Sequence, residues 1–197
     1  MVDDQRLFLG LDAFCAQFTA QVRGAGPPES EHAIHLCLAL GFQSALDLPV
    51  GSIVFERRAG ARRIDLWVLP FDLGIEVKFH RPIPIGRSRP ETQLYGGLLA
   101  DFNKLAAASV ADRMVVLVTD PVGMNYLDRN ASNVLPLEVG RSTTLPADFV
   151  AGLPKTAAVQ AVADGPWRSL CVDALWRGSC DSWQLIAWRV AVGMAVA

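Results

Sequence analysis

Three runs rich in β-branched and aromatic residues follow one another in the chain, at residues 51–58, 61–70 and 73–80. Only the segments "AGA" and "PFD" separate them, and each has the length of a tight turn. Two strands that pair in parallel need a crossover of about a dozen residues or more, and neither break is long enough for one. The sequence therefore predicts three consecutive antiparallel strands.

Helical spacing of apolar residues surrounds these three runs. It occurs at residues 6–23 and 29–46, and again at 88–109 after the third run. The segment "RMVVLVTD" at 113–120 is an unbroken apolar run, typical of a strand buried on both faces, and 121–132 suit a short helix. Because a helix that joins two strands forms a crossover, we expect an α/β chain with a mixed β-sheet flanked by helices.

The last third of the chain divides into two parts. Residues 136–165 show no clear period, and we interpret them as a connecting segment. Residues 167–191 indicate two strands joined around "GSCD", a C-terminal β-hairpin crowded by tryptophans. We expect residues 1–135 to form the core of the fold, and residues 136–197 to form the connecting segment and the hairpin, packed on the same domain.

Composition limits the classes of function. Hydrophobic residues make up 51% of the chain, yet no apolar run reaches the about 20 residues that span a bilayer, so no membrane partner is expected. The N-terminal segment "MVDDQRLFLG" carries two aspartates where a secretory signal has basic residues, which favours a cytoplasmic protein. The four cysteines are scattered and form no CxxC pair, so neither a structural zinc nor a disulfide framework is predicted.

Positive charge is concentrated in one part of the sequence. The net charge of −2 argues against a protein that coats nucleic acid along its whole surface. However, nine of the 18 Lys and Arg residues lie between residues 56 and 104, where only six of the 20 acidic residues are found. Such a cluster is suited to phosphate contacts. The candidate nucleic-acid-binding residues are Arg57, Arg58, Arg62, Arg63, Arg81, Arg87 and Arg89.

Polar residues follow one side of the third run. Side chains alternate along a strand, so Glu76 and Lys78 share a face, and Asp65 is expected on the polar face of the preceding strand. Antiparallel pairing brings Asp65 near Glu76. Two close carboxylates repel each other unless a cation compensates them, and Mg²⁺ commonly takes one or two protein carboxylates. A lysine about 7 Å along the same strand can orient water or stabilise charge on a phosphate, which predicts phosphodiester hydrolysis.

The segments "RID" at 63–65, "EVK" at 76–78 and "ETQLY" at 91–95 resemble the PD-(D/E)XK nuclease superfamily. The resemblance covers about residues 29–120, although Ile64 stands where a proline is typical. In that superfamily a helix precedes a strand meander that carries Asp and then (Asp/Glu)xLys, and a following helix crosses to a further strand. The resemblance therefore implies a restriction-endonuclease-like fold.

The resemblance also implies a function and a set of site residues. It implies a Mg²⁺-dependent endonuclease that acts on DNA, with Mn²⁺ as an alternative metal and RNA as an alternative substrate. Asp65 and Glu76 would bind the metal, and Lys78 would position or activate water. Many members add a glutamate from the early helix, here Glu31 or else Glu29, and a glutamine from the later helix, here Gln93. Cutting both strands of a duplex calls for two such sites, which a homodimer would provide.

Other interpretations use the same residues. One is a catalytically inactive module that keeps the nuclease fold and binds nucleic acid or a partner protein. Another is a scaffold whose exposed apolar C-terminal hairpin mediates oligomerisation. For Asp65, Glu76 and Lys78, the simplest alternative is a solvated strand face with a cross-strand ion pair, which contributes about 0.2–1 kcal/mol. These interpretations differ in how the residues lie in space.

Overall fold

A computed structural model gives the fold of residues 2–60, 62–80 and 91–193. Its centre is a seven-stranded mixed sheet with the strand order β1-β2-β3-β4-β7-β6-β5. In chain order, the helices and strands of these residues are α1 (Asp4–Ala25), α2 (Glu31–Ala45), β1 (Ile53–Ala59), β2 (Arg62–Val68), β3 (Leu73–His80), α3 (Glu91–Ala106), β4 (Asp112–Thr119), α4 (Pro121–Asn130), β5 (Ser142–Leu145), α5 (Lys155–Ala161), β6 (Leu170–Cys180) and β7 (Trp183–Val192).

The pairing of the first four strands confirms the mixed sheet. β1 pairs antiparallel with β2, and β2 pairs antiparallel with β3, as the short breaks predicted. β3 pairs in parallel with β4, and α3 provides the crossover between them. The α/β class with a mixed, helix-flanked sheet is therefore confirmed.

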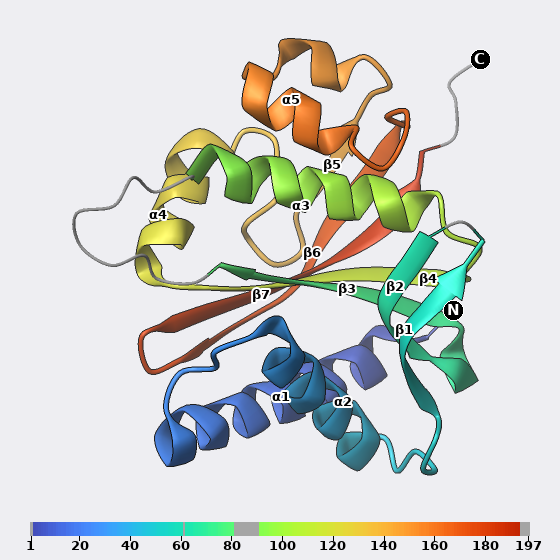
Figure 1. Cartoon of the computed structure of the whole chain (residues 1–197), viewed down its shortest axis with the longest axis vertical. Helices are drawn as coiled ribbons and strands as arrows, with labels where there is room; N and C mark the ends of the chain where they lie inside the picture. The colour runs from blue at the N-terminus through green and yellow to red at the C-terminus, as the bar shows by residue number, and fades with distance from the viewer. Residues whose placement is uncertain (1, 61, 81–90, 194–197) are drawn as a thin grey trace.

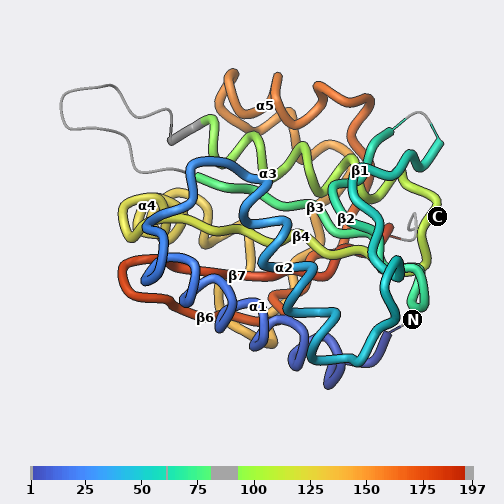
Figure 2. The backbone as a smooth tube through the Cα atoms, turned by 60° about the horizontal axis from the view of Figure 1, so that its bottom comes forward, coloured from blue at the N-terminus to red at the C-terminus, as the bar shows by residue number. Residues whose placement is uncertain are grey.

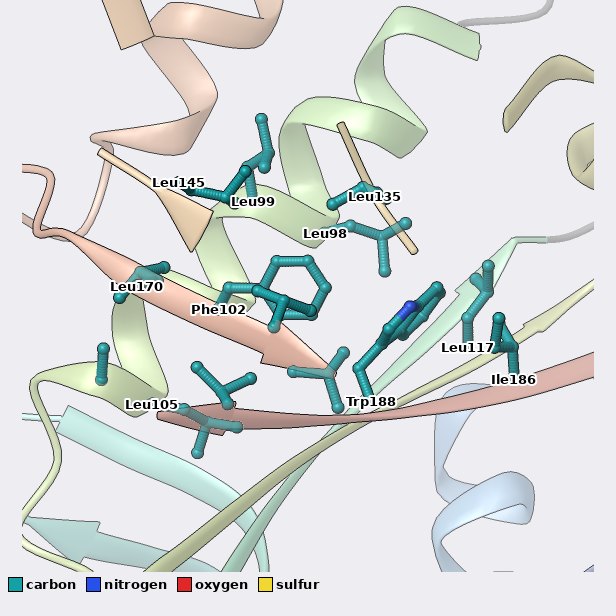
Figure 3. Close-up of a cluster of buried hydrophobic side chains, with 14 of the residues drawn as sticks. Leu98, Leu99, Phe102, Leu105, Leu117, Leu135, Leu145, Leu170, Ile186 and Trp188 are labelled. Atoms are coloured by element: carbon teal, nitrogen blue, oxygen red, sulfur yellow. The ribbon is translucent and has the colours of Figure 1, made fainter. Parts of the chain in front are cut away.

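Helices cover both faces of the sheet. α1 and α2 lie together on one side, and α3 and α5 lie on the other (Figures 1 and 2). The cluster under α1 and α2 includes Phe14, Phe18 and Phe42, which are at most 1% exposed. The cluster under α3 centres on Phe102 and Trp188, whose rings meet edge to face with centroids 5.7 Å apart (Figure 3). Burial of both faces explains why the β4 segment is apolar without alternation.

Residues 136–165 are not a plain connecting segment, so that interpretation was wrong. They contain the edge strand β5, a 3₁₀ turn at Phe149–Gly152, and α5. β5 has four residues and α5 has seven, which is too short for a hydrophobic period to show. α5 is held by α3, where a Cβ atom added at Gly96 would lie 2.9 Å from Cα of Ala157. Close packing against α3, rather than an amphipathic sequence pattern, therefore stabilises α5.

The C-terminal hairpin is confirmed as β6 and β7, and it lies inside the sheet. β7 pairs antiparallel with β4, so the hairpin continues the sheet that the first four strands begin. Trp176, Trp183 and Trp188 are 8%, 3% and 0% exposed. These tryptophans are covered by the protein's own helices, which removes the basis for a scaffold that oligomerises through an exposed apolar hairpin. Separately, none of the helices in the described residues has the length and apolar character needed to cross a bilayer.

Candidate functional site

The site begins where β2 leaves β3. The ladder between these strands ends at Leu66 and Ile75, one residue before Asp65 would pair with Glu76. At this point β2 also changes face: Ile64 packs in the cluster under α3, whereas Leu66 packs in the cluster under α1 and α2. The expected simple alternation around Asp65 is therefore wrong. Asp65 does not lie on a continuous polar face; it lies where the strand turns over.

An irregularity in β1 accompanies this turnover. Glu56 has φ of 50°, in the left-handed region, and it is missing from the otherwise continuous β1–β2 register. A non-glycine residue in this region is uncommon and marks a local distortion. The side chain of Glu56 lies 2.9 Å from Arg63 and 3.6 Å from His32 of α2. The distortion therefore adjoins Asp65, α2 and the basic β1–β2 hairpin.

Two carboxylates replace the missing strand partner of β3. The backbone N–H of Val77 donates to Oδ2 of Asp65 at 2.8 Å, and the N–H of Phe79 donates to Oε1 of Glu31 at 2.9 Å. Charge-assisted hydrogen bonds of this kind fix a carboxylate firmly. Glu31 opens α2 and Asp65 lies in β2, so residues from two elements converge on the edge of β3 that β2 leaves unpaired. Glu29 lies outside α2 and is exposed, so Glu31 is the glutamate placed at this edge.

Glu76 is the most deeply buried acid of the site, at 1% exposure. Burial raises the pKa of its carboxyl to about 9, and the charge of Asp65 adds to this effect. Lys104 of α3 opposes both, because its Nζ lies 2.6 Å from Oε2 of Glu76. The other oxygen, Oε1, is buried without a hydrogen-bond partner among the described residues. Among the residues that the structure describes, Glu76 thus has one paired oxygen and one oxygen without a partner.

Lys78 lies on the same face of β3 and also meets α3. Its Nζ is 3.2 Å from Oδ2 of Asp101, and its side chain is 29% exposed. Burial lowers the pKa of Lys78, but Asp101 and Glu31 outweigh burial and raise it, so the ammonium is kept charged. Burial raises the pKa of Asp101 to about 6, against the pull of Lys78. The shared face of Glu76 and Lys78 that the sequence predicted is therefore the face that α3 covers.

α2 adds a histidine to the site. His35 lies one turn after Glu31, and its Nε2 is 3.7 Å from Oδ2 of Asp65. Burial lowers the pKa of His35, and the nearby charge of Asp65 only partly opposes this. The imidazole is therefore neutral at neutral pH, and it adds no positive charge beside the carboxylates.

Three members of the cluster were not predicted from the sequence: His35, Asp101 and Lys104. Asp101 and Lys104 follow Gln93 by eight and eleven residues, which places all three on one side of α3. A Cβ atom added at Gly97, on the same side, would lie 3.5 Å from Cε of Lys78. This stripe of polar residues on an otherwise apolar helix is the sequence feature that could have placed Asp101 and Lys104 in the site. Gln93 itself is exposed and makes no hydrogen bond with the described residues.

Some of the basic residues near the site contact other parts of the protein, and some are exposed to solvent. The guanidinium of Arg57 lies over the ring of Trp67, 4.0 Å from its centroid, and Arg63 pairs with Glu56. Arg62 donates to the backbone carbonyl of Asp164. Arg57, Arg58 and Arg63 are exposed on the β1–β2 hairpin. The remaining candidates, Arg81, Arg87 and Arg89, lie outside the described residues.

The side chains as they stand do not form a finished metal centre. Within residues 2–60, 62–80 and 91–193, no group of three or more His, Cys, Asp or Glu side chains is arranged to hold a metal ion. The carboxylate oxygens instead contact backbone N–H groups and lysines. The chain matches no protein-family model, no curated protein and no solved structure.

Proposed function

We propose that this protein is a Mg²⁺-dependent nuclease that hydrolyses phosphodiester bonds in DNA. One observation carries the proposal: Glu31 of α2, Asp65 of β2, and Glu76 and Lys78 of β3 converge where β2 departs from β3. The order α2-β1-β2-β3-α3-β4 also agrees with the element order of the PD-(D/E)XK superfamily, and supports a restriction-endonuclease-like fold. Neither feature is expected of a solvated strand face with a chance ion pair.

The charges of the cluster suit one divalent cation. When ionised, the carboxylates of Glu31, Asp65, Glu76 and Asp101 carry four negative charges against two from the lysines, which leaves two uncompensated. The raised pKa of Glu76 reflects this excess as well as burial. Its buried Oε1, which has no hydrogen-bond partner in the described part of the chain, is an oxygen of the kind that Mg²⁺ prefers. Asp65 and Glu76 would hold the metal, and Glu31 would lie beside it.

The residues of the chain have separate tasks in hydrolysis. A bound Mg²⁺ ion would supply Lewis-acid stabilisation of the negative charge on the phosphate. Lys78 presents a partly exposed ammonium that Asp101 holds in place, and it stabilises the charge that develops on the phosphate oxygens. Arg57 and Arg58, exposed on the β1–β2 hairpin, hold the polyanionic backbone without reading its sequence.

A second function is favoured by the pairing of the lysines. Glu76 is almost fully buried and bound to Lys104, and Lys78 is bound to Asp101. If these ion pairs are permanent, they neutralise the residues that catalysis needs. The protein would then be an inactive nuclease-fold module that binds nucleic acid or a partner protein through the basic hairpin.

Cleavage assays with matched variants separate the two functions. Plasmid, linear and single-stranded DNA, and an RNA of the same sequence, are incubated with Mg²⁺ or Mn²⁺ and with the wild-type protein, Lys78→Met, Asp65→Asn or Glu138→Gln. Asp65→Asn retains an oxygen for the N–H of Val77, and Glu138→Gln changes an exposed carboxylate far from the site. We expect metal-dependent cutting that falls by about a hundredfold or more in the two site variants only.

A different set of results would support the binding module instead. If DNA binds with the same affinity to the wild-type protein and to Asp65→Asn, and neither metal supports cutting, the nuclease proposal fails and the binding module is the function.

A further inference from the structure

Lys104 occupies a position that the resemblance did not predict. It lies in the last turn of α3, its side chain is 18% exposed, and its Nζ is 2.6 Å from Oε2 of Glu76. The charges of Asp65 and Asp101 also act on it. One ammonium therefore lies among three carboxylates, two of which are the residues assigned to the metal.

We propose that Lys104 is an internal counter-cation that competes with the divalent metal for Glu76 and thereby sets the metal affinity of the site. This inference rests on the proposed function, because it concerns the same metal. Lys104 is a positioning residue in this proposal, since it acts through Glu76 and not on the substrate.

Geometry makes the competition direct. A metal held by Glu76 in its ionised form would share that buried carboxylate with the ammonium, whose Nζ lies 2.6 Å from Oε2. Little water screens the repulsion between two cations there. Lys78 differs, because its partner is Asp101 and not a residue assigned to the metal. Metal binding at Glu76 is therefore expected to weaken the ion pair of Lys104 and not that of Lys78.

The helix offers the ammonium another partner. Asp101 lies three residues before Lys104, at a spacing that places both side chains on the same side of α3. Oδ2 of Asp101 is buried and is already paired with Nζ of Lys78 at 3.2 Å, so Lys104 would share this carboxylate with Lys78. The four-carbon stem of lysine is flexible enough for such a shift. On metal binding, we expect Lys104 to leave Glu76 and turn toward Asp101 or solvent.

Metal titration without nucleic acid tests the proposal. Mn²⁺ binding is measured by calorimetry for the wild-type protein, Lys104→Met, Lys104→Arg and Lys155→Met. Lys155→Met removes the same charge from an exposed position on α5, and Lys104→Arg keeps the charge at the site. We expect at least tenfold tighter binding for Lys104→Met, and unchanged binding for the other two variants.

A measurement on the unmodified protein avoids dependence on how the variants fold. Lysine acetylation is followed by mass spectrometry with and without saturating Mg²⁺, with Lys155 as the internal reference. If Lys104 leaves Glu76, its acetylation rate relative to Lys155 rises at least severalfold with Mg²⁺. An unchanged ratio overturns the release of Lys104 to solvent, and the calorimetric comparison of Lys104→Met with wild type then decides the competition.

The outcomes also separate this inference from the proposed function. If the wild-type protein binds Mn²⁺ and Lys104→Met binds no more tightly, the inference fails and the metal-dependent function stands. If only Lys104→Met binds Mn²⁺, the competition is supported and the natural protein is not a metal-dependent nuclease. If neither binds, both proposals fail.

Discussion

Replacing Glu76 by glutamine tests the electrostatics of the site without any substrate. Because burial and Asp65 raise the pKa of Glu76 from 4.5 to about 9, the folded, metal-free protein keeps a proton there that the unfolded chain releases above about pH 4.5. The folded state then binds more protons, so the free energy of unfolding falls as pH rises from about 4.5 to about 9. Each pH unit corresponds to about 1.4 kcal/mol, which gives about 3 kcal/mol between pH 4.5 and pH 7.

Glutamine has no proton to release, and it retains an oxygen that accepts from Lys104. We therefore expect Glu76→Gln to unfold with nearly the wild-type free energy at pH 5, and to be more stable than wild type at pH 8 by up to about 4 kcal/mol. Urea unfolding in the presence of a chelator measures this at both pH values. Glu138→Gln, which removes the same charge from a carboxylate whose side chain is 75% exposed, serves as the control.

One result would refute this reasoning. If Glu76→Gln is less stable than wild type at pH 8, the buried pair with Lys104 outweighs the cost of burying the carboxylate, since breaking such a pair costs about 3–5 kcal/mol. Glu76 would then be ionised in the folded protein at neutral pH.

Two further predictions concern packing and nucleic-acid binding. A Cβ atom added at Gly41 would lie 2.5 Å from the backbone N of Phe14, so Gly41→Ala should force α1 and α2 apart and lower the free energy of unfolding by about 1–3 kcal/mol in urea. Gly24→Ala, where nothing lies within 4 Å, should be neutral or slightly stabilising. Arg58→Ala should weaken DNA binding equally for unrelated sequences and reduce its salt dependence, as measured by fluorescence anisotropy at several salt concentrations, and a loss confined to one sequence would contradict a phosphate contact.

Local sequence patterns determined much of the architecture. The β-branched and aromatic residues of the three strand runs, the helical period of α1, α2 and α3, and the unbroken apolar run of β4 are each visible within one element. The breaks between the strand runs then allowed only antiparallel pairing, and α3 required a crossover. The shared face of Glu76 and Lys78 followed from strand geometry alone. The sequence predicts these features because each of them depends only on residues that are close together in the chain.

Tertiary structure decided the rest. β5 and α5 are short, and they exist because β6 and α3 hold them, so no periodic signal reveals them. The turnover of β2 at Asp65 coincides with a distortion at Glu56 in a different strand. The pairing of Lys104 with Glu76 joins residues 28 positions apart, and its effect on the pKa of Glu76 arises from burial that only the packed sheet and helix create. The sequence alone therefore determined which charged groups the chain brings to β3, and packing decided which of them meet and what charge they carry.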